Sequence, residues 1–447
     1  MESSENLSPA SPSNSQEKLS KPEWLEEKSV NELKFCNELL SEHELRFIED
    51  CFYDIDGAMP IQIVENIVAE KLIGASVSYG IANKIKNITN ALKHLCYSEE
   101  VPQVDDEINV RNGVLKTDGA FLNERKFCHN RLNVTFAVDT SPPLRWISFM
   151  NELLEPDDVK TLQEYMGYCL INSTKAQTML FLVGKGGEGK SRIGVVMNYL
   201  FGNACYCESI VDLSKDKYLR GNLVGKTVLV DDDMSFEGIK DTSFIKSLVT
   251  SETSISVQWK NRQAIQAQLR VRAMVFSNSP PTSLYDKTDG WHRRLIVLST
   301  KPAPVNRVID RDLSEKLISE IDGIFLWAFE GLRRLISNNY QFTLSDRTSS
   351  LMKEIRRESC NISEFIEDNQ AVQFIPNNIT CSVDIYNAYC NWCYGNGLTP
   401  FKQKSFYDWL SQNADKYNLI ATNKAHNGRN YVRGYSGIRV SFKSIIS

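Results

Sequence analysis

Hydrophobic residues recur at helical spacing in the first part of the chain, after a polar N-terminal stretch. Between residues 22 and 100 two apolar stripes repeat every three or four residues, the period of a helix with one buried face. We therefore expect helices here, with both stripes in a core. Residues 1–22 are instead rich in Ser, Asn, Pro and Glu, which predicts a disordered tail. The stripes are Ile61, Val64, Ile67, Val68 and Leu72, and Ile81, Ile85, Ile88, Leu92 and Leu95.

The pattern changes to short apolar runs between residues 108 and 138. Asn112-Gly113 and Asp118-Gly119 separate these runs, which predicts hairpin strands. Helical spacing returns from Trp146 and again in a segment that starts at Pro156 and runs to Leu170. We expect residues 23–170 to form a helical N-terminal domain with a small β section.

Residues 171–300 alternate strand-like and helix-like segments, which favours an α/β core with a mainly parallel sheet. Residues 301–350 read as amphipathic helices followed by a polar linker from Ser337 to Ser350. The remaining segment, 351–447, reads as a small domain of helices that ends in a hairpin.

Composition limits the classes of protein that this chain can represent. The 447 residues carry a net charge of −5, so a nucleic-acid surface has to be local. The longest apolar runs are shorter than a membrane helix needs, and the N-terminus lacks the features of a secretory signal. We expect a cytoplasmic protein, in a bacterial host cell, with no membrane partner. Eleven cysteines predict free thiols, including the closely spaced pairs Cys205/Cys207 and Cys390/Cys393.

A complete phosphate-binding motif of the form GxxxxGK[ST] follows the strand-like run Thr178–Val183 and precedes the helical pattern Arg192–Phe201. Glycines let backbone N–H groups turn around phosphates, and the helix N-terminus adds partial positive charge. The lysine would reach the β- and γ-phosphates and the serine would hold Mg2+, so we expect ATP and Mg2+ as cofactors. The motif consists of Gly184, Lys185, Gly186, Gly187, Glu188, Gly189, Lys190 and Ser191.

Polar residues follow two further strand-like runs. Lys226–Asp233 ends in three carboxylates, of which we favour Asp232 and Asp233 as catalytic residues, with Asp232 also at the metal; Asp231 is the alternative. Asn278 follows Val271–Ser277 and would face the crevice where ligands bind in parallel sheets, although Asn-Ser-Pro-Pro is also ordinary turn chemistry.

Arg293 and Arg294 precede the strand-like run Leu295–Leu298. Paired arginines at the start of a strand are usually solvated. One of the two could instead act as an arginine finger, which neutralises the charge that develops on the transferred phosphoryl group. We expect such a finger to come from a neighbouring subunit.

The last segment is locally basic. Between Phe401 and Ser447 eight lysines and arginines face two aspartates, an excess of 8 − 2 = +6. Lys402 and Lys404 lead a helical segment that could enter the major groove. Arg429 and Arg433 lie at or beside a hairpin tip that could act as a wing on the minor groove or the DNA backbone. The alternative is a solvated basic face, on a domain that docks proteins.

The order of these signals resembles a known family. GKGGEGKS, VLVDDDM, FSN and WHRRL follow one another as they do in the superfamily 3 helicases, and most closely in the phage and plasmid primase–helicase group, whose relatives include a poxvirus nucleoside-triphosphatase. The resemblance extends over roughly residues 30–447 and includes WISFMNELL before the core and YNAYCNWC after it.

That resemblance implies a P-loop AAA+-like core, a C-terminal winged-helix domain and a homo-hexameric ring with ATP between subunits. It implies 3′ to 5′ translocation on single-stranded DNA, with Lys260 matching the basic residue of a DNA-gripping hairpin, and contact with duplex origin DNA through the C-terminal domain. Too few residues precede the helical segment for a primase domain, so we expect none. The expected function is an ATP-dependent helicase in replication; the alternative is an origin-binding initiator that uses ATP mainly as an assembly switch.

Overall fold

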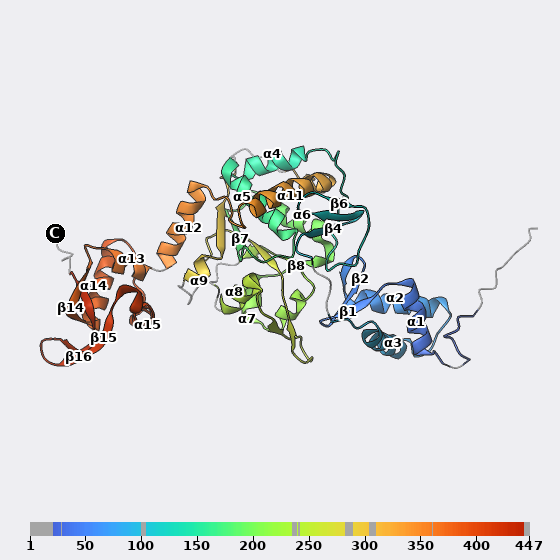
Figure 1. Ribbon diagram of the computed structural model, residues 1–447, viewed down its shortest axis with the longest axis horizontal. Helices are drawn as coiled ribbons and strands as arrows, with labels where there is room; N and C mark the ends of the chain where they lie inside the picture. Colours follow the sequence, from blue (N-terminus) through green and yellow to red (C-terminus); the bar gives the residue numbers. More distant parts are fainter. Residues whose placement is uncertain are drawn as a thin grey trace, which may run out of the picture. The chain divides into compact units, whose positions relative to one another are not determined.

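The computed structural model describes residues 21–27, 29–99, 104–234, 239, 242–281, 289–303, 310–359 and 361–441. Apart from Lys21 and Pro22, the expected tail lies outside these residues. The chain forms two compact units, and each is described separately (Figure 1). The first contains the described residues up to 99 together with Phe127–His129, and the second contains the rest.

The first unit has the expected helices and an unexpected small sheet. Its helices are α1 (Glu32–Glu42), α2 (Ile61–Gly74) and α3 (Ile81–Leu95). Both predicted stripes lie largely in its core, although Leu95 is 44% exposed. The antiparallel strands β1 (Arg46–Ile48), β2 (Cys51–Asp54) and β3 (Gly57–Met59) were not predicted, because strands of three or four residues are too short to show a two-residue period.

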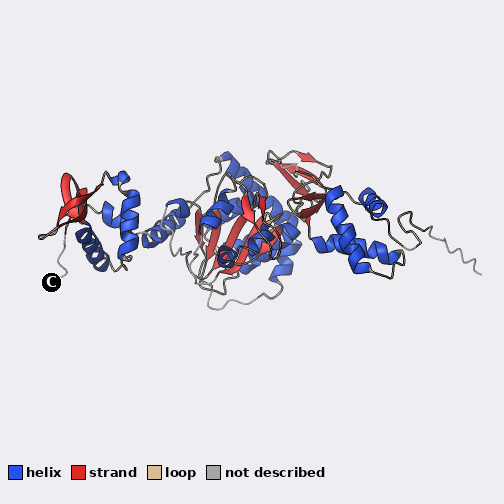
Figure 2. Cartoon of the chain, turned by 90° about the horizontal axis from the view of Figure 1, so that it is seen from below, coloured by secondary structure: helices blue, strands red, loops and turns tan. Residues whose placement is uncertain are grey.

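The second unit is built on a five-stranded sheet in the order β13-β7-β12-β9-β8, in which every neighbouring pair is parallel. This confirms the α/β expectation. All residues of β7 and β12 are buried, as expected for central strands with helices packed around them (Figure 2). The strands are β7 (Met179–Val183), β8 (Cys205–Cys207), β9 (Val228–Met234), β12 (Arg272–Ser277) and β13 (Leu295–Ser299).

Helices connect these strands and follow the last of them. The connecting helices are α6 (Ser191–Phe201), α7 (Ile210–Lys215), α8 (Thr242–Thr250) and α9 (Asp289–His292), with the 3-10 turns η1 (Gly202–Ala204) and η2 (Leu219–Leu223). After β13 come α10 (Leu313–Ser319) and α11 (Ile321–Ser337), both within the predicted helical region.

Residues 104–126 and 130–170, which we assigned to the N-terminal domain, belong to the second unit. They contain the predicted hairpin strands β4 (Glu107–Val110), β5 (Gly113–Lys116) and β6 (Phe121–Leu122), followed by α4 (Leu144–Leu153) and α5 (Pro156–Cys169). Helix α5 is buried from Thr161 to Cys169 because it packs on the sheet and on α11. The Tyr165 hydroxyl donates to the Ala273 carbonyl of β12 at 2.6 Å.

The expected linker after α11 is held against the core. Glu164 of α5 accepts from the backbone N–H and hydroxyl of Thr343, each at 2.7 Å, and Asp158 accepts from Ser345 at 2.6 Å and Thr348 at 2.8 Å. Helix α12 (Asp346–Ser359) follows directly, and its Arg347 donates to the Ser299 hydroxyl at the end of β13 at 3.3 Å. Polar sequence was misleading here because these groups bind buried carboxylates rather than water.

The last described residues form helices and a three-stranded antiparallel sheet in the order β14-β16-β15 around their own hydrophobic core. The expected helices and final hairpin are present; strand β14 was not predicted. The elements are α13 (Asn361–Glu367), β14 (Val372–Cys381), α14 (Ser382–Gly395), α15 (Gln403–Asn413), the 3-10 turn η3 (Asp415–Tyr417), β15 (Ile420–His426) and β16 (Tyr431–Val440).

No helix within the described ranges is long and apolar enough to cross a bilayer. The cysteines in the described ranges form no disulfide, and no group of three metal-binding side chains gathers among those residues. Cys205 and Cys393 are buried as expected, Cys390 is half-buried, and Cys207 is exposed, contrary to expectation.

Two glycines allow α5 and α11 to cross closely. A Cβ at Gly331 of α11 would overlap the Gln163 carbonyl of α5, and a Cβ at Gly167 of α5 would overlap the backbone at Ala328 and Leu332. We expect Gly331→Ala to lower the free energy of unfolding by about 1–3 kcal/mol, because the rigid backbones have to separate. Thermal unfolding followed by circular dichroism measures this.

Gly395→Ala is the matched control, because this helical glycine has no atom within 4 Å of the added methyl group. Alanine there should be neutral or stabilising by up to about 1 kcal/mol. Equal unfolding temperatures for both variants would contradict the close crossing.

Candidate functional site

The phosphate-loop motif lies where parallel strands end. Strand β7 ends at Val183, and α6 begins at Ser191 with no side-chain cap on its first turn. Gly186, Gly187 and Gly189 have φ values of 104°, 82° and 97°, which residues with a Cβ rarely adopt. The loop can therefore present backbone N–H groups and a helix N-terminus to an anion.

A buried ion pair occupies the centre of this loop. The Glu188 carboxylate lies 3.0 Å from Lys190 Nζ and accepts from the Gly186 N–H at 2.9 Å. The exposed fractions of the Glu188 and Lys190 side chains are only 4% and 8%. Burial by itself raises the pKa of Glu188, but hydrogen bonds from backbone N–H groups and from Lys190 outweigh it, so the pKa lies below its ordinary value. Glu188 was expected only as one residue of the loop, and its contact with Lys190 was not predicted.

Asn278 meets the loop from the neighbouring strand. It follows the last residue of β12, and β12 pairs directly with β7. Its side-chain oxygen lies 3.4 Å from Lys190 Nζ. The structure therefore brings together two residues 88 positions apart in sequence, as the strand pattern predicted.

The three carboxylates at the end of β9 differ in environment. Asp231 is buried and accepts from the Ile210 N–H of α7 at 2.9 Å, whereas Asp232 and Asp233 are exposed. Burial raises the pKa of Asp231 to about 6, although backbone hydrogen bonds oppose this. A register shift between β12 and β9 falls at this point. Asp231 therefore anchors α7, and Asp232 and Asp233 remain accessible.

Asp232 lies beside the loop helix. Its Oδ1 is 3.8 Å from the position of a Cβ on Gly194 of α6. The exposed Ser191 hydroxyl begins the same helix. One carboxylate and one hydroxyl, with the remaining positions filled by phosphate and water, is a usual environment for Mg2+. Both residue types suit Mg2+, and its binding by Ser191 and Asp232 stays a prediction.

Arg293 and Arg294 lie at the amino-terminal ends of the parallel strands, whereas the loop lies at their carboxyl ends. They precede β13, whose first residue, Leu295, pairs with Met179 at the start of β7, roughly 13 Å of strand from the loop. Arg294 is buried, and its guanidinium donates to the Gly290 carbonyl of α9, whereas Arg293 is exposed. Of the two, Arg293 is the one that another subunit could meet.

Lys260 is at the tip of a two-stranded hairpin formed by β10 (Ile255–Val257) and β11 (Ile265–Ala267). Its side chain is exposed. Trp259, beside it, packs so closely on Gly221 that a Cβ there would lie 2.7 Å from the indole ring. The hairpin implied by the resemblance is present; DNA contact by Lys260 stays a prediction.

The predicted basic residues of the C-terminal segment are all exposed. Lys402 and Lys404 flank the start of α15, and Arg429 lies in the turn between β15 and β16, with its backbone N–H bonded to Asn427 at 3.0 Å. Arg433 lies on β16. Helix and hairpin have the predicted form, and their contact with DNA stays a prediction.

Comparisons with known proteins give a fold and one partial family match. Residues 182–294 match a family described as "Family of unknown function (DUF5906)". No curated protein matches the chain. The solved apo structure of the NrS-1 C-terminal region is similar, with a TM-score of 0.50, 11% sequence identity, and coverage of 93% of this chain and 100% of that chain. An A-form apo structure of the same region has a TM-score of 0.50 and 11% sequence identity, with coverage of 91% of this chain and 100% of that chain. At this identity the likeness shows a shared fold alone.

Asp231→Asn should change how stability depends on pH. The folded pKa, about 6, lies above the ordinary value of 3.8, so between these values the folded state binds more protons than the unfolded state. Wild-type stability therefore falls as pH rises through this window. Asparagine can still accept from Ile210 but does not ionise. We expect the free energy of unfolding of the variant, relative to that of wild type, to increase by about 1–3 kcal/mol as the pH rises from about 4 to about 7.5.

Thermal unfolding at a series of pH values measures this difference. Asp157→Asn is the control, because the Asp157 side chain is 70% exposed. Profiles of Asp231→Asn and wild type that stay parallel across the window would refute the buried-carboxylate interpretation.

Proposed function

We propose that this chain is an ATP-driven DNA helicase that assembles as a homo-hexamer and acts in the replication of a phage, plasmid or other mobile element. In this proposal the second unit is a P-loop AAA+-like motor, and the residues after α12 are a winged-helix DNA-binding domain. The ring moves 3′ to 5′ along single-stranded DNA.

One observation carries the proposal. Lys190 of the loop after β7 lies 3.4 Å from the side chain of Asn278 after β12, and Asp232 at the end of the adjacent strand β9 lies beside α6, the helix that follows the loop. This set contains a phosphate-binding cation, a polar amide and a metal-binding carboxylate, which are the groups that phosphoryl transfer requires. Lys190 would bind the β- and γ-phosphates, Ser191 and Asp232 would hold Mg2+, and Asp233 would orient the attacking water.

Two further features fit a ring. Arg293 is exposed at the edge of the sheet opposite the loop, so it suits a nucleotide bound by a neighbouring subunit. Lys260 projects from a hairpin that Trp259 fixes to the core, as the resemblance to superfamily 3 helicases implies for a DNA-gripping element. ATP-driven movement of this hairpin would pull the strand.

The second candidate is an origin-binding initiator in which ATP mainly drives assembly. The exposed basic residues on α15 and on the β15–β16 hairpin favour it, because a helix and a hairpin tip of this kind suit duplex DNA.

Strand displacement on a forked duplex distinguishes the two functions. Wild-type protein with ATP and Mg2+ should separate the strands, and Lys190→Ala should abolish both separation and ATP hydrolysis because the phosphates lose their cation. DNA binding without nucleotide should persist in the variant, which controls for folding. ATP-dependent assembly on duplex DNA without any strand separation by wild type would favour the initiator.

Arg293→Ala should lower the ATPase rate at least about 100-fold, as expected when an arginine finger is lost. Mixing this variant with Lys190→Ala should recover about one quarter of wild-type activity, because about one interface in four then pairs an intact loop with an intact Arg293. ATPase assays across mixing ratios measure the recovery. If the mixtures hydrolyse ATP only at the sum of the rates of the two separate variants, Arg293 does not act at the nucleotide site of a neighbouring subunit.

A further inference from the structure

Strand β14 contains a bulge that opens a cavity in the C-terminal domain. Ile375 pairs with Gly437 of β16 and Ile379 pairs with the adjacent Ser436, so the residues between Ile375 and Ile379 are extra. Asn378 fixes the bulge by donating to the Ile438 carbonyl at 2.6 Å. Bulges often re-aim side chains next to functional sites.

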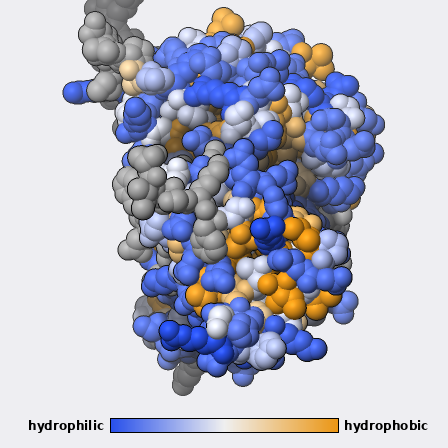
Figure 3. All heavy atoms as spheres, turned by 90° about the vertical axis from the view of Figure 1, so that its left-hand side faces the viewer, coloured by the Kyte–Doolittle hydropathy of each residue, from blue (hydrophilic) through white to orange (hydrophobic). Residues whose placement is uncertain are grey.

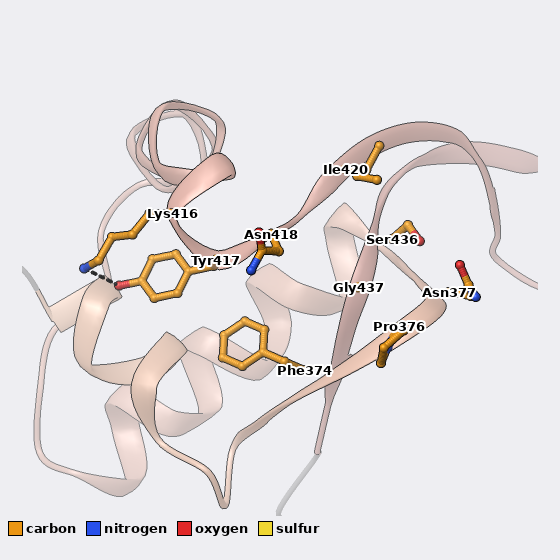
Figure 4. Close-up of a pocket in the computed structure, with 9 residues that line it drawn as sticks. All are labelled: Phe374, Pro376, Asn377, Lys416, Tyr417, Asn418, Ile420, Ser436 and Gly437. Atoms are coloured by element: carbon orange, nitrogen blue, oxygen red, sulfur yellow. Dashed lines mark hydrogen bonds between the residues drawn. The ribbon is translucent and has the colours of Figure 1, made fainter.

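The cavity has a volume of about 550 Å3 and lies between the bulge, η3 and the start of β15 (Figure 4). This volume is in the usual range of ligand pockets. Gly437 lies at its wall with φ 99°, a backbone conformation that residues with a side chain rarely adopt.

Two aromatic rings line one side of the cavity. Phe374 and Tyr417 lie with their ring planes 2° apart and their centroids 5.8 Å apart, and Trp409 of α15 packs behind Tyr417 at 6.2 Å. Phe374 is 44% exposed. Tyr417 is half-buried, so the two parallel rings form a partly exposed stacking surface for a flat conjugated group.

Polar groups complete the lining. Asn377, Asn418 and Ser436 carry amide and hydroxyl groups that can bond the edge of a heterocycle. Lys416 is 58% exposed, and its ammonium is held 3.0 Å from the Tyr417 hydroxyl and 3.4 Å from a Glu367 carboxylate oxygen. The cation is therefore fixed at the edge of the aromatic surface.

The segment that contributes η3, β15 and β16 to the cavity is basic in sequence, although the Glu367 carboxylate pairs with Lys416 at the cavity edge. Seven lysines and arginines but only two aspartates lie between residues 401 and 441. Figure 3 faces the C-terminal elements and shows hydrophobic side chains gathered within a mostly hydrophilic face. A ligand with flat rings on a polyanionic backbone matches both features.

We propose that this cavity binds a nucleobase of single-stranded DNA, stacked on Phe374 and Tyr417, with a neighbouring phosphate at Lys416. The site goes beyond the proposed helicase activity, because it needs neither ATP nor the Lys260 hairpin. It would hold a strand on the C-terminal domain by its bases, whereas the exposed lysines of α15 suit duplex backbone.

Fluorescence anisotropy in a Lys190→Ala background, without nucleotide, tests the proposal with a thymidine oligonucleotide and an abasic oligonucleotide of equal length. The starting protein should prefer the oligonucleotide with bases by about 5- to 100-fold. Phe374→Ala and Phe374→Leu should both reduce this preference, since leucine keeps the bulk but not the ring. Tyr431→Ala removes a 76% exposed aromatic outside the cavity and should leave it unchanged.

Photocrosslinking locates the contact directly. An oligonucleotide with 5-iodouracil should crosslink to the peptides that contain Phe374 or Tyr417. Crosslinks absent from both peptides, or equal base preference in Phe374→Leu and the starting protein, would overturn the proposal. The Lys190→Ala background removes the proposed motor activity, so base preference is measured independently of it. A wild-type protein that fails to separate strands would therefore refute the helicase proposal without affecting this test.

Discussion

Strands β7, β12 and β9 lie side by side in parallel, and all three end at the same edge of the sheet. Parallel pairing places the loop, Asn278 and the β9 carboxylates within reach of one another, although they span almost a hundred residues of sequence. An antiparallel neighbour would carry its last residue to the other edge. The same rule places Arg293, before β13, away from the loop of its own chain.

Much of this arrangement could be predicted from the sequence because its signals are local. The loop motif with its flanking strand and helix, the acidic end of β9 and Asn278 after β12 each depend on a short stretch of chain, and the parallel sheet then brings them together. The register of the three carboxylates at the end of β9 was harder to predict. The sequence favoured Asp232 and Asp233, with Asp231 as the alternative. The structure buries Asp231 against α7 through one hydrogen bond and leaves Asp232 and Asp233 exposed beside a bulge in β9.

Other features depend on contacts between distant segments and left no local signal. The polar stretch after α11 docks because Asp158 and Glu164 are buried in α5, which no reading of residues 337–350 alone could show. This docking has a structural result. Arg347 of α12 reaches Ser299, next to Thr300, and a Cβ on Gly184 would overlap the Thr300 hydroxyl. The start of the phosphate loop and the helix that leads to the C-terminal domain are therefore joined through the end of β13.

The Glu188–Lys190 pair means that the loop already contains an anion of its own. A phosphate group that takes the Gly186 N–H and the Lys190 ammonium has to displace a carboxylate that is 96% shielded from solvent, so binding is an exchange of one anion for another. Occupancy of the loop is thus set by a competition within the protein itself, between the Glu188 carboxylate and a phosphate group for the same N–H and ammonium donors.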